Sequence, residues 1–383
     1  MSILQIIPRL EAGGAERTTI DIAAALVNAG HSALVASEAG RLESELRATG
    51  ALLLKIPVAS KNPFTILRNI RRLKNIIAEH DVDLVHARSR APAWSAFYAA
   101  KQTRIPFVTT HHGTYKARNA LKRWYNSVMF RGDAIIANSQ WTADHIRNHY
   151  ANKPKRIAVI ARGIDLDRFD PSQISDQSRV AMRQSWNAGA GARVVLLPGR
   201  LTRWKGQLIL IEALARLSGA GKLPADLHVV IAGDAQGRHS YLAEIQNAVA
   251  KGGLQEVVTL SSHIGDMAPA YMAADIVVSA SSKPEAFGRV PAEAAAMGRA
   301  VIATAHGGAL ETILPGQTGL LVPPGDAVAL GEALMSLLGL PEEQLQKMGS
   351  WGRAHIEAHY TVQKMCADTI GLYGELVKSS AIT

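Results

Sequence analysis

The chain has 383 residues, of which 48% are hydrophobic and 19% charged, and its formal net charge is +10. This length fits two domains of roughly 150 to 200 residues, and the composition excludes a disordered chain. No apolar run reaches the roughly 18 residues that span a bilayer, and the start, MSILQIIPRL, has no basic region typical of a secretory signal. Cys366 is the only cysteine, so a disulfide framework is excluded and a reducing cytoplasm is the expected compartment.

The positive charge is concentrated in the first half of the chain. Residues 1–170 contain 25 Lys and Arg against 14 Asp and Glu, whereas residues 171–383 contain 17 against 18. This asymmetry predicts an anionic partner for the first half: nucleic acid, a membrane surface or a phosphate-bearing substrate. No nucleic-acid-binding module is recognisable, so nucleic acid is not expected.

Short apolar runs alternate with segments of helical periodicity along the whole chain. The strands predicted in the first half are 3–7, 33–37, 52–56, 83–87, 107–111, 134–138 and 156–160. Those predicted in the second half are 193–199, 227–233, 257–262, 275–281, 300–305 and 319–323. Strands that are apolar throughout and separated by helices indicate parallel sheets covered on both faces. Two such series predict an α/β protein with two doubly wound, Rossmann-like domains.

A polar and then glycine-containing stretch between about 170 and 192 predicts the domain boundary. The expected domains are residues 1–170 and 171–360, followed by a helix over 361–383. In doubly wound domains ligands lie at the carboxyl ends of the strands, so the informative residues should follow strands.

Two motifs follow predicted strands of the first half. EAGGAER (11–17) opens a helix, where Gly13 and Gly14 let the backbone approach a ligand and the helix N-terminus attracts anions. TTHHGTYK (109–116) ends a strand with His111 and His112, which must point to opposite faces. One of the two histidines is therefore expected to face a ligand, and a metal-binding pair is not.

Two basic stretches of the first half have either a solvated basic face or a contact with anionic lipid headgroups. The segment 61–80 reads as an amphipathic helix, and 115–133 interleaves cations with aromatic residues. The candidates for acceptor or membrane contact are Arg68, Arg71, Arg72, Lys116, Lys122, Arg123 and Trp124.

The motif GRLTRWKG (199–206) follows the first strand of the second half. It places Arg200, Arg203 and Lys205 between two glycines, as either a solvated loop or a clamp for a diphosphate.

The segment KPEAFGRVPAEAAAMG (283–298) carries Glu285 before a short loop and Glu293 inside the following helix, whose first turn suits Pro291. Taken alone, the two carboxylates fit an acid/base pair, a metal site, a clamp on sugar hydroxyls or simple helix-start chemistry.

The D-x-D pair Asp81 and Asp83 would suit Mg²⁺ in a metal-dependent transferase. It stands at the entry of a strand, which is the wrong end for the cleft. No metal is therefore expected.

Taken together, these motifs resemble the retaining GT-B glycosyltransferases of family 4, which use nucleotide-activated sugars, and the resemblance covers essentially the whole chain. The stretches that carry it are GGAER (13–17), HHG (111–113), RGIDLDRFDP (162–171), GRLTRWKG (199–206), YMAADIVVSAS (271–281) and EAFGRVPAEAAAMG (285–298). The Glu-x7-Glu spacing of Glu285 and Glu293 is the most specific of these features.

The resemblance implies a role for each site residue. Glu285 touches the donor sugar, Glu293 touches the ribose, and Arg200 and Lys205 hold the diphosphate. His112 lies near the reacting sugar, and the Gly13–Gly14 loop lies against the donor phosphate or the acceptor. The backbone of Phe287, Gly288 and Arg289 faces the donor. Arg289 departs from the family, which more often has an aliphatic residue there.

Three other functions compete with sugar transfer. A glycoside hydrolase would use Glu285 and Glu293 as its acid/base pair, but eight helical residues separate two groups by about 12 Å, beyond the roughly 9.5 Å of an inverting pair. A nucleotide-sugar epimerase shares the two-domain architecture, and a non-catalytic nucleotide-sugar-binding protein would share the clamp.

The favoured function is a metal-independent hexosyltransferase that uses a nucleoside-diphosphate sugar as co-substrate and no other cofactor. The breaking sugar–phosphate bond builds negative charge on the diphosphate, which Arg200, Lys205 and helix N-termini would meet. The expected acceptor is a glycan or lipid-linked glycan of lipopolysaccharide or cell-envelope polysaccharide synthesis, at the cytoplasmic face of the membrane.

Overall fold

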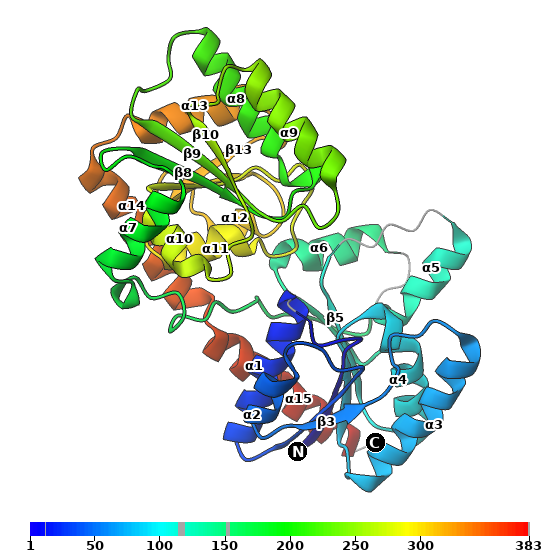
Figure 1. Cartoon of the computed structure of the whole chain (residues 1–383). Coiled ribbons are helices and arrows are strands. Elements are labelled where there is room, and N and C mark those ends of the chain that lie inside the picture. Colours follow the sequence, from blue (N-terminus) through cyan, green and yellow to red (C-terminus); the bar gives the residue numbers. More distant parts are fainter. Residues whose placement is uncertain (12, 114–118, 151–153, 382–383) are drawn as a thin grey trace. The chain divides into compact units, whose positions relative to one another are not determined.

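The computed structural model describes residues 1–11, 13–113, 119–150 and 154–381. The chain forms two compact units, one built from Met1–Gly163 with Val362–Thr383 and the other from Ile164–Thr361 (Figure 1). Each unit is an α/β layer structure around one parallel sheet, as predicted.

The first unit contains a seven-stranded sheet in the order β3-β2-β1-β4-β5-β6-β7. Its strands are β1 (Ser2–Ile6), β2 (Ser32–Ser37), β3 (Leu52–Lys55), β4 (Leu84–Ala87), β5 (Phe107–His111), β6 (Ala134–Ala137) and β7 (Ile157–Val159). Every residue of β1, β4, β5 and β6 is buried, because helices cover both faces of a parallel sheet.

Alternate residues of these strands supply two separate cores. Leu4 and Ile6 of β1 pack under the helices α3 (Pro63–Glu79), α4 (Arg90–Thr103) and α6 (Gln140–His149) and the 3₁₀ turn η1 (Val128–Phe130). Ile3 and Ile7 pack on the other face, under α1 (Gly14–Asn28), α2 (Glu43–Ala48) and α15 (Val362–Ala381). The short helix α5 (Ala120–Ser127) precedes η1. Alternation with period two therefore builds both layers.

The second unit contains a six-stranded sheet in the order β10-β9-β8-β11-β12-β13. Its strands are β8 (Arg193–Pro198), β9 (Leu227–Ala232), β10 (Val258–Ser261), β11 (Ile276–Ser279), β12 (Ala300–Thr304) and β13 (Gly319–Val322). All thirteen predicted strands are confirmed, with ends within two residues of the predicted ones.

Helices cover both faces of the second sheet. The main core lies under α8 (Gln207–Gly219), α9 (His239–Lys251) and α13 (Ala327–Leu338). The remaining helical segments are η2 (Pro171–Gln173), α7 (Asp176–Ser185), η3 (Arg203–Lys205), α10 (Met267–Ala273), α11 (Arg289–Ala296), α12 (Ala309–Thr312) and α14 (Glu342–His359).

The division between the units falls at Gly163/Ile164, seven residues before the predicted boundary at 170/171. The residues between these positions make their contacts within the second unit. The Ile164 N–H donates to the Tyr360 carbonyl at 2.7 Å, and buried Phe169 lies 6.2 Å from the Tyr271 ring. The boundary therefore follows from packing on residues more than 100 positions away, and the polar composition near 170 does not mark it.

Candidate functional site

The topological switch point of the second sheet lies between β8 and β11, where the chain leaves in opposite directions. Ligands of doubly wound sheets bind beyond the carboxyl ends of the strands at such a point. The loop after β8 contains Arg200 and Lys205, and the loop after β11 contains Glu285. The fold therefore brings the two motifs of the second half to one place.

Gly206 fixes how the loop after β8 meets the end of β11. Its φ of +81° is left-handed, and a Cβ on it would stand 1.9 Å from the Ala280 carbonyl oxygen. Only glycine tolerates both conditions. This close approach places Lys205, one residue earlier, beside the segment that follows β11.

Lys205 and Glu285 form an ion pair in this loop cluster. The Lys205 Nζ lies 2.8 Å from the Glu285 Oε1, and the two side chains are 12% and 21% exposed. The Ser281 hydroxyl donates to the same carboxylate oxygen at 2.6 Å. Residues 80 positions apart thus form one partly desolvated charged cluster.

Gly308 holds the backbone of the segment 285–288 in place. The Gly308 N–H donates to the Glu285 carbonyl at 2.9 Å, and a Cβ on Gly308 would stand 2.1 Å from the Phe287 carbonyl oxygen. The Phe287 side chain is buried and lies edge-on to Tyr360, with 5.8 Å between ring centroids. Phe287 therefore positions this loop through its side chain, so any contact of Phe287 with a ligand falls to its backbone.

Glu293 is the buried carboxylate of α11, a helix that begins after Gly288 at a φ of +79°. Its Oε2 accepts from the Tyr271 hydroxyl at 2.9 Å, and its Oε1 accepts from the Arg289 Nε at 2.8 Å. Burial, followed by the Glu293 charge, raises the pKa of Tyr271 well above its ordinary value. Tyr271 therefore stays a protonated donor, and with Arg289 it fixes the orientation of the carboxylate.

The other two cations of GRLTRWKG behave differently from Lys205. Arg203 is exposed and forms an ion pair with Glu244 at 2.5 Å on the surface of the unit. Arg200 is exposed beyond the end of β8, and its backbone carbonyl accepts from the Gln207 amide at 3.1 Å. Arg200 and Lys205 thus remain the two candidate cations at the switch point.

In the first unit, Gly14 and His112 meet at Arg162. A Cβ on Gly14 would stand 2.7 Å from the Arg162 Nη1. The Arg162 Nη2 lies 3.3 Å from the His112 Nδ1. Gly13 caps α1 without a side chain, and the carboxylate of Glu16 lies against it. Arg162, the first residue of RGIDLDRFDP (162–171), therefore joins the glycine loop to His112.

The doubled histidine is divided between the core and this cluster. His111 is buried between Phe130 and Tyr150, whose ring centroids lie 6.0 and 5.6 Å away. Burial, followed by the charge of Arg162, holds the pKa of His112 well below its usual value. Alternation along β5 thus sends His112, and not His111, to the side of Gly14.

Comparisons with known proteins bear on the family of the chain. The profile described as Glycosyltransferase Family 4 matches residues 12–168, and that of Glycosyl transferases group 1 matches residues 178–355. The crystal structure of a glycosyltransferase from Rickettsia africae is 35% identical, with a TM-score of 0.89 over 98% of both chains. The chain is a GT-B glycosyltransferase of group 1.

Two further proteins are similar to this glycosyltransferase. Anabaena HepE, solved in complex with UDP and glucose, is 24% identical, with a TM-score of 0.82 over 98% of this chain and 99% of that one. D-inositol 3-phosphate glycosyltransferase of Xylanimonas cellulosilytica is 30% identical over 67% of this chain. The match spans 63% of that relative's length.

Several residues that shape the glycosyltransferase site were missed from the sequence. Tyr271, Ser281 and Arg162 all stand in motifs that carried the resemblance, yet none had a predicted role. Their positions before or after a strand were the available signal, but neither polar type nor spacing identifies a partner that is far away in the chain.

Groups that could hold a metal are absent from the described ranges: no cluster of three or more His, Cys, Asp or Glu occurs there. The Asp83 carboxylate accepts from the Ser2 N–H at 2.7 Å and so joins the entries of β1 and β4. Asp83 of the D-x-D pair thus takes part in holding the sheet together.

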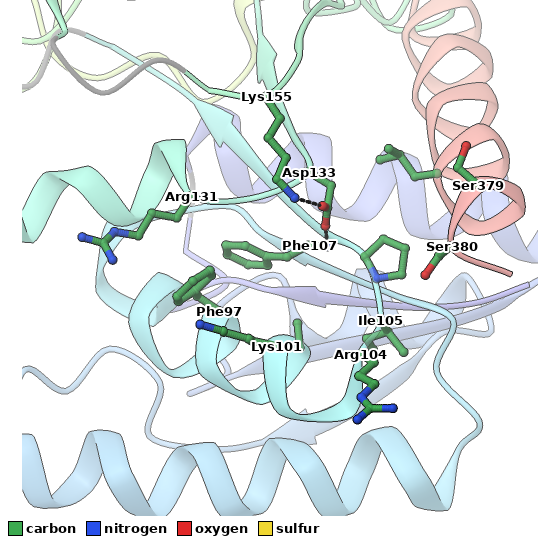
Figure 2. A pocket seen from close by; sticks show the side chains of 13 residues that line it. Phe97, Lys101, Arg104, Ile105, Phe107, Arg131, Asp133, Lys155, Ser379 and Ser380 are labelled. Atoms are coloured by element: carbon green, nitrogen blue, oxygen red, sulfur yellow. Dashed lines mark hydrogen bonds and ion pairs between the residues drawn. The ribbon is translucent and has the colours of Figure 1, made fainter. Parts of the chain in front are cut away.

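A cavity of about 590 Å³ lies where β5, β6 and β7 of the first sheet begin, at the end opposite to their carboxyl ends (Figure 2). It is bordered by Phe107 at the start of β5 and by Lys101 and Arg131. Asp133 accepts from the Lys155 Nζ and from the Phe107 N–H, each at 2.9 Å. None of the predicted site residues lines this cavity.

The buried histidines predict how stability depends on pH. Burial, then the charges of His145 and Arg90, lowers the pKa of His111 to about 3, and burial also holds the pKa of His86 well below its usual value. Below pH 6.5 the unfolded chain binds a proton at each of these histidines, and the folded protein does not. The free energy of unfolding therefore decreases as the pH is lowered.

Between pH 7 and pH 5, His111 alone should contribute a loss of about 2 kcal/mol. Denaturant unfolding of the His111→Phe variant, which keeps a ring between Phe130 and Tyr150, should show a loss that is smaller by this amount. Equal losses in the two proteins would contradict the neutral, buried state of His111.

Proposed function

We propose that this glycosyltransferase moves a hexose, with retention of configuration, from a nucleoside-diphosphate sugar bound by the second unit to an acceptor bound by the first. The observation that carries the proposal is the pair of carboxylate clusters at the switch point, Lys205–Glu285–Ser281 and Arg289–Glu293–Tyr271. Each carboxylate has a polar partner that orients it, and each stands where the fold binds nucleotides.

The two clusters suit opposite ends of one nucleotide sugar. Glu293 is oriented to accept hydrogen bonds from ribose hydroxyls, and Glu285 to accept them from the sugar. As the sugar–phosphate bond breaks, negative charge develops on the leaving diphosphate, and Lys205 and Arg200 are the cations available to stabilise it. We propose that these cations do so without a metal ion.

The proposal is tested by a transfer assay with UDP-, GDP- and ADP-hexoses, in the presence and absence of EDTA, combined with thermal-shift titration of the free nucleotides. We expect one nucleotide to stabilise the protein and its sugar conjugate to be consumed at a rate that EDTA leaves unchanged. If no nucleotide shifts the melting temperature, the assignment of the donor is wrong. An activity abolished by EDTA would overturn metal independence alone.

We further propose that the acceptor is a lipid-linked or lipopolysaccharide-core glycan and that the first unit contacts an anionic membrane surface. By sequence count this unit carries a net charge of +13, against −3 for the second. No helix within the described residues is long and apolar enough to cross a membrane. Contact would therefore have to be made by surface residues.

On α3, exposed apolar side chains without a predicted role lie beside the predicted basic residues. On α3, Phe64 and Leu67 are 81% and 64% exposed, beside the exposed Arg68 and Arg71. These four residues recur at steps of three and four and so share one face of the helix. An apolar face beside cations suits the boundary of an anionic bilayer.

The helix α5 offers a second group of this kind. Leu121 and Trp124 are 73% and 53% exposed, next to the exposed Lys122 and Arg123. Trp124 stacks on Trp94 of α4, with ring centroids 4.5 Å apart. Arg72 is also exposed, whereas Lys116 lies outside the described residues.

Vesicle binding should therefore depend on apolar side chains as well as on charge. Substituting Phe64→Ser or Trp124→Ser should each weaken partition onto vesicles of anionic lipid about tenfold, because an inserted apolar side chain contributes about 1.5–3 kcal/mol. Binding should also fall with added salt. The control is Trp351→Ser in the second unit, where the side chain is also half-exposed. Equal effects of all three substitutions would contradict a specific membrane surface.

A further inference from the structure

The cavity of about 590 Å³ at the start of β5 has no part in the proposed sugar transfer, because no residue of the transfer site lines it. It is formed by the end of α4, the start of β5, the turn before β6 and the end of α15. Its volume lies within the range of roughly 300–1,000 Å³ that is typical of sites for small ligands. The cavity is therefore a candidate site for a second ligand, separate from the nucleotide sugar.

Cations outnumber acids around this cavity. The described residues of its lining that carry charge are Lys101, Arg104, Arg131, Lys155 and Asp133. Asp133 is already paired with the Lys155 Nζ at 2.9 Å. Glu375, which precedes the lining residue Leu376 on α15, is paired with Arg156 at 2.7 Å. Within the described ranges, three of the four lining cations thus have no carboxylate partner.

Lys101 and Arg104 are the two cations whose side chains have no partner in the part of the chain that the structure describes. Both are exposed, and neither side chain makes an ion pair or a hydrogen bond there. Arg131, by contrast, donates from its Nε to the Ser127 hydroxyl at 3.3 Å, and its guanidinium carbon lies 5.3 Å from the centre of the Trp94 ring. Lys101 and Arg104 are therefore the cations that can turn toward an anion.

The backbone of Arg104 also indicates a use for its side chain. Arg104 follows the last residue of α4 with a φ of +59°, in the left-handed region where glycine is the usual residue after a helix. A side chain in this conformation costs stability. Arginine is thus a poorer residue than glycine for ending this helix, and a role for the guanidinium group outside the backbone would explain its presence.

Part of the cavity wall is apolar. Phe97 and Phe107 contact each other, with ring centroids 5.8 Å apart, and the Phe107 N–H donates to Asp133 (Figure 2). Leu376 of α15 is half-buried and lines the same cavity. An inorganic anion would leave this apolar surface in water, whereas an anion with an attached hydrocarbon would cover it. The lining is amphipathic, and the expected ligand is amphipathic as well.

An aromatic stack connects the cavity with the surface of α3 and α5 that is proposed to contact the membrane. Arg131 lines the cavity and lies over the Trp94 ring. Trp94 stacks on Trp124 of α5, and Trp124 is 53% exposed on that proposed membrane surface. The cavity is thus continuous with this surface, which favours a lipid over a water-soluble phosphate as its occupant.

We propose that this cavity binds the phosphate headgroup of an anionic phospholipid. Lys101 and Arg104 contact the phosphate, which arginine can bind with two parallel N–H groups, and the first carbons of an acyl chain lie against Phe97 and Leu376. The proposal rests on the proposed function only in taking the lipid from the membrane that the first unit contacts. The same two cations also stand at the negative end of the α4 dipole, and a role confined to that helix end predicts different effects on stability and binding.

The probe is dihexanoyl phosphatidylglycerol, a short-chain anionic lipid, titrated as monomers by calorimetry into the whole protein in an excess of UDP. UDP occupies the proposed donor site, and monomers avoid general adsorption to a vesicle surface. We expect saturable binding that is at least about tenfold tighter than that of glycerol 3-phosphate, which has the phosphate without the acyl chains. Zwitterionic dihexanoyl phosphatidylcholine should not bind, because its positive charge would face the lining cations.

Two substitutions should weaken binding of this lipid. Lys101→Met and Arg104→Gly should each weaken it about fivefold, the usual contribution of one basic residue to contact with anionic lipid. The matched control for Lys101→Met is Lys251→Met, at an exposed lysine in the last turn of α9. The matched control for Arg104→Gly is Asp81→Gly, at another left-handed residue of the first unit, with a φ of +46°. Neither control should change the affinity for the lipid.

Melting temperatures separate lipid binding from a role at the end of α4. Without lipid, Arg104→Gly should melt no lower than the unmodified protein, because glycine accepts the left-handed backbone without strain. Asp81→Gly should behave in the same way. With lipid present, Arg104→Gly alone of these two variants should lose part of the stabilisation that a bound ligand gives.

Three outcomes overturn the proposal. Glycerol 3-phosphate that binds as tightly as the lipid would assign the cavity to a water-soluble phosphate ester. Lipid binding that is unchanged in both Lys101→Met and Arg104→Gly would leave these cations with a role at the end of α4 only. Lipid binding that is lost in Phe64→Ser would move the lipid to the surface of α3.

Failure of the lipid site and failure of the proposed function give different results. Sugar transfer by a protein that does not bind the lipid would remove the site in the cavity and leave the proposed transfer standing. Lipid binding that depends on Lys101 and Arg104, in a protein that transfers sugar from none of the donors, would remove the proposed transfer and leave the lipid site standing.

Discussion

Replacing Lys205 with methionine should lower kcat for sugar transfer by about 10²- to 10³-fold, the usual effect of removing one group that stabilises charge in the transition state. Lys205 is only 12% exposed, so its charge acts in a partly desolvated site. KM for the donor should rise by less, because the charge on the diphosphate grows mainly as the sugar bond breaks. Steady-state kinetics with saturating acceptor measure both constants.

The matched control is Arg203→Met, two residues away in the same 3₁₀ turn. Arg203 is exposed and held by Glu244, so kcat should stay within about threefold of the unmodified value. A double-mutant cycle of Lys205→Met with Glu285→Gln should be strongly non-additive, because the two side chains contact each other. Equal losses for Lys205→Met and Arg203→Met would show a general effect of charge and contradict the clamp.

Substituting Gly206→Ala should lower the free energy of unfolding by about 3 kcal/mol or more. The left-handed φ of +81° strains any Cβ, and this Cβ would stand 1.9 Å from the Ala280 carbonyl, so backbone must move. The displaced turn carries Lys205, and activity should therefore fall even in the fraction that remains folded. Chemical denaturation and kinetics at low temperature separate the two losses.

The opposite end of the same helix offers the control. Gly219 closes α8, and a Cβ there would meet nothing within 4 Å. Gly219→Ala should leave activity unchanged and stabilise the protein by about 0.4–1 kcal/mol, because alanine has fewer unfolded conformations to lose. A Gly206→Ala variant as stable as Gly219→Ala would show that the approach of the turn to β11 is not close.

The sheet architecture could be predicted because each parallel strand is buried on both faces and therefore reads as an apolar run. Val194 to Pro198 in β8 and Ala134 to Ala137 in β6 are continuous buried stretches of this kind. The same property places polar residues such as Lys205 and His112 just beyond the strand ends. The fold class, and the end of the sheet that carries the site, could thus be predicted from local composition.

Partners across long sequence separations could not be predicted. Nothing in GRLTRWKG tells Lys205, which meets Glu285, from Arg203, which meets Glu244. The choice depends on Gly206 touching Ala280, a contact of the folded backbone. The buried Arg88 gave no signal either, because an arginine after a strand is normally read as a solvated residue.

The return of the chain to its first unit reverses the usual order of folding during synthesis. Domains generally fold as they emerge, the N-terminal one first. Here Met365, Cys366 and Tyr373 of α15 belong to the core of the first unit, so that core stays open until the last helix has been made. The second unit is finished at Thr361, where its end pairs with its own beginning at Ile164. We therefore expect the second unit to fold first during synthesis. The first unit should depend on chaperones until α15 has been made.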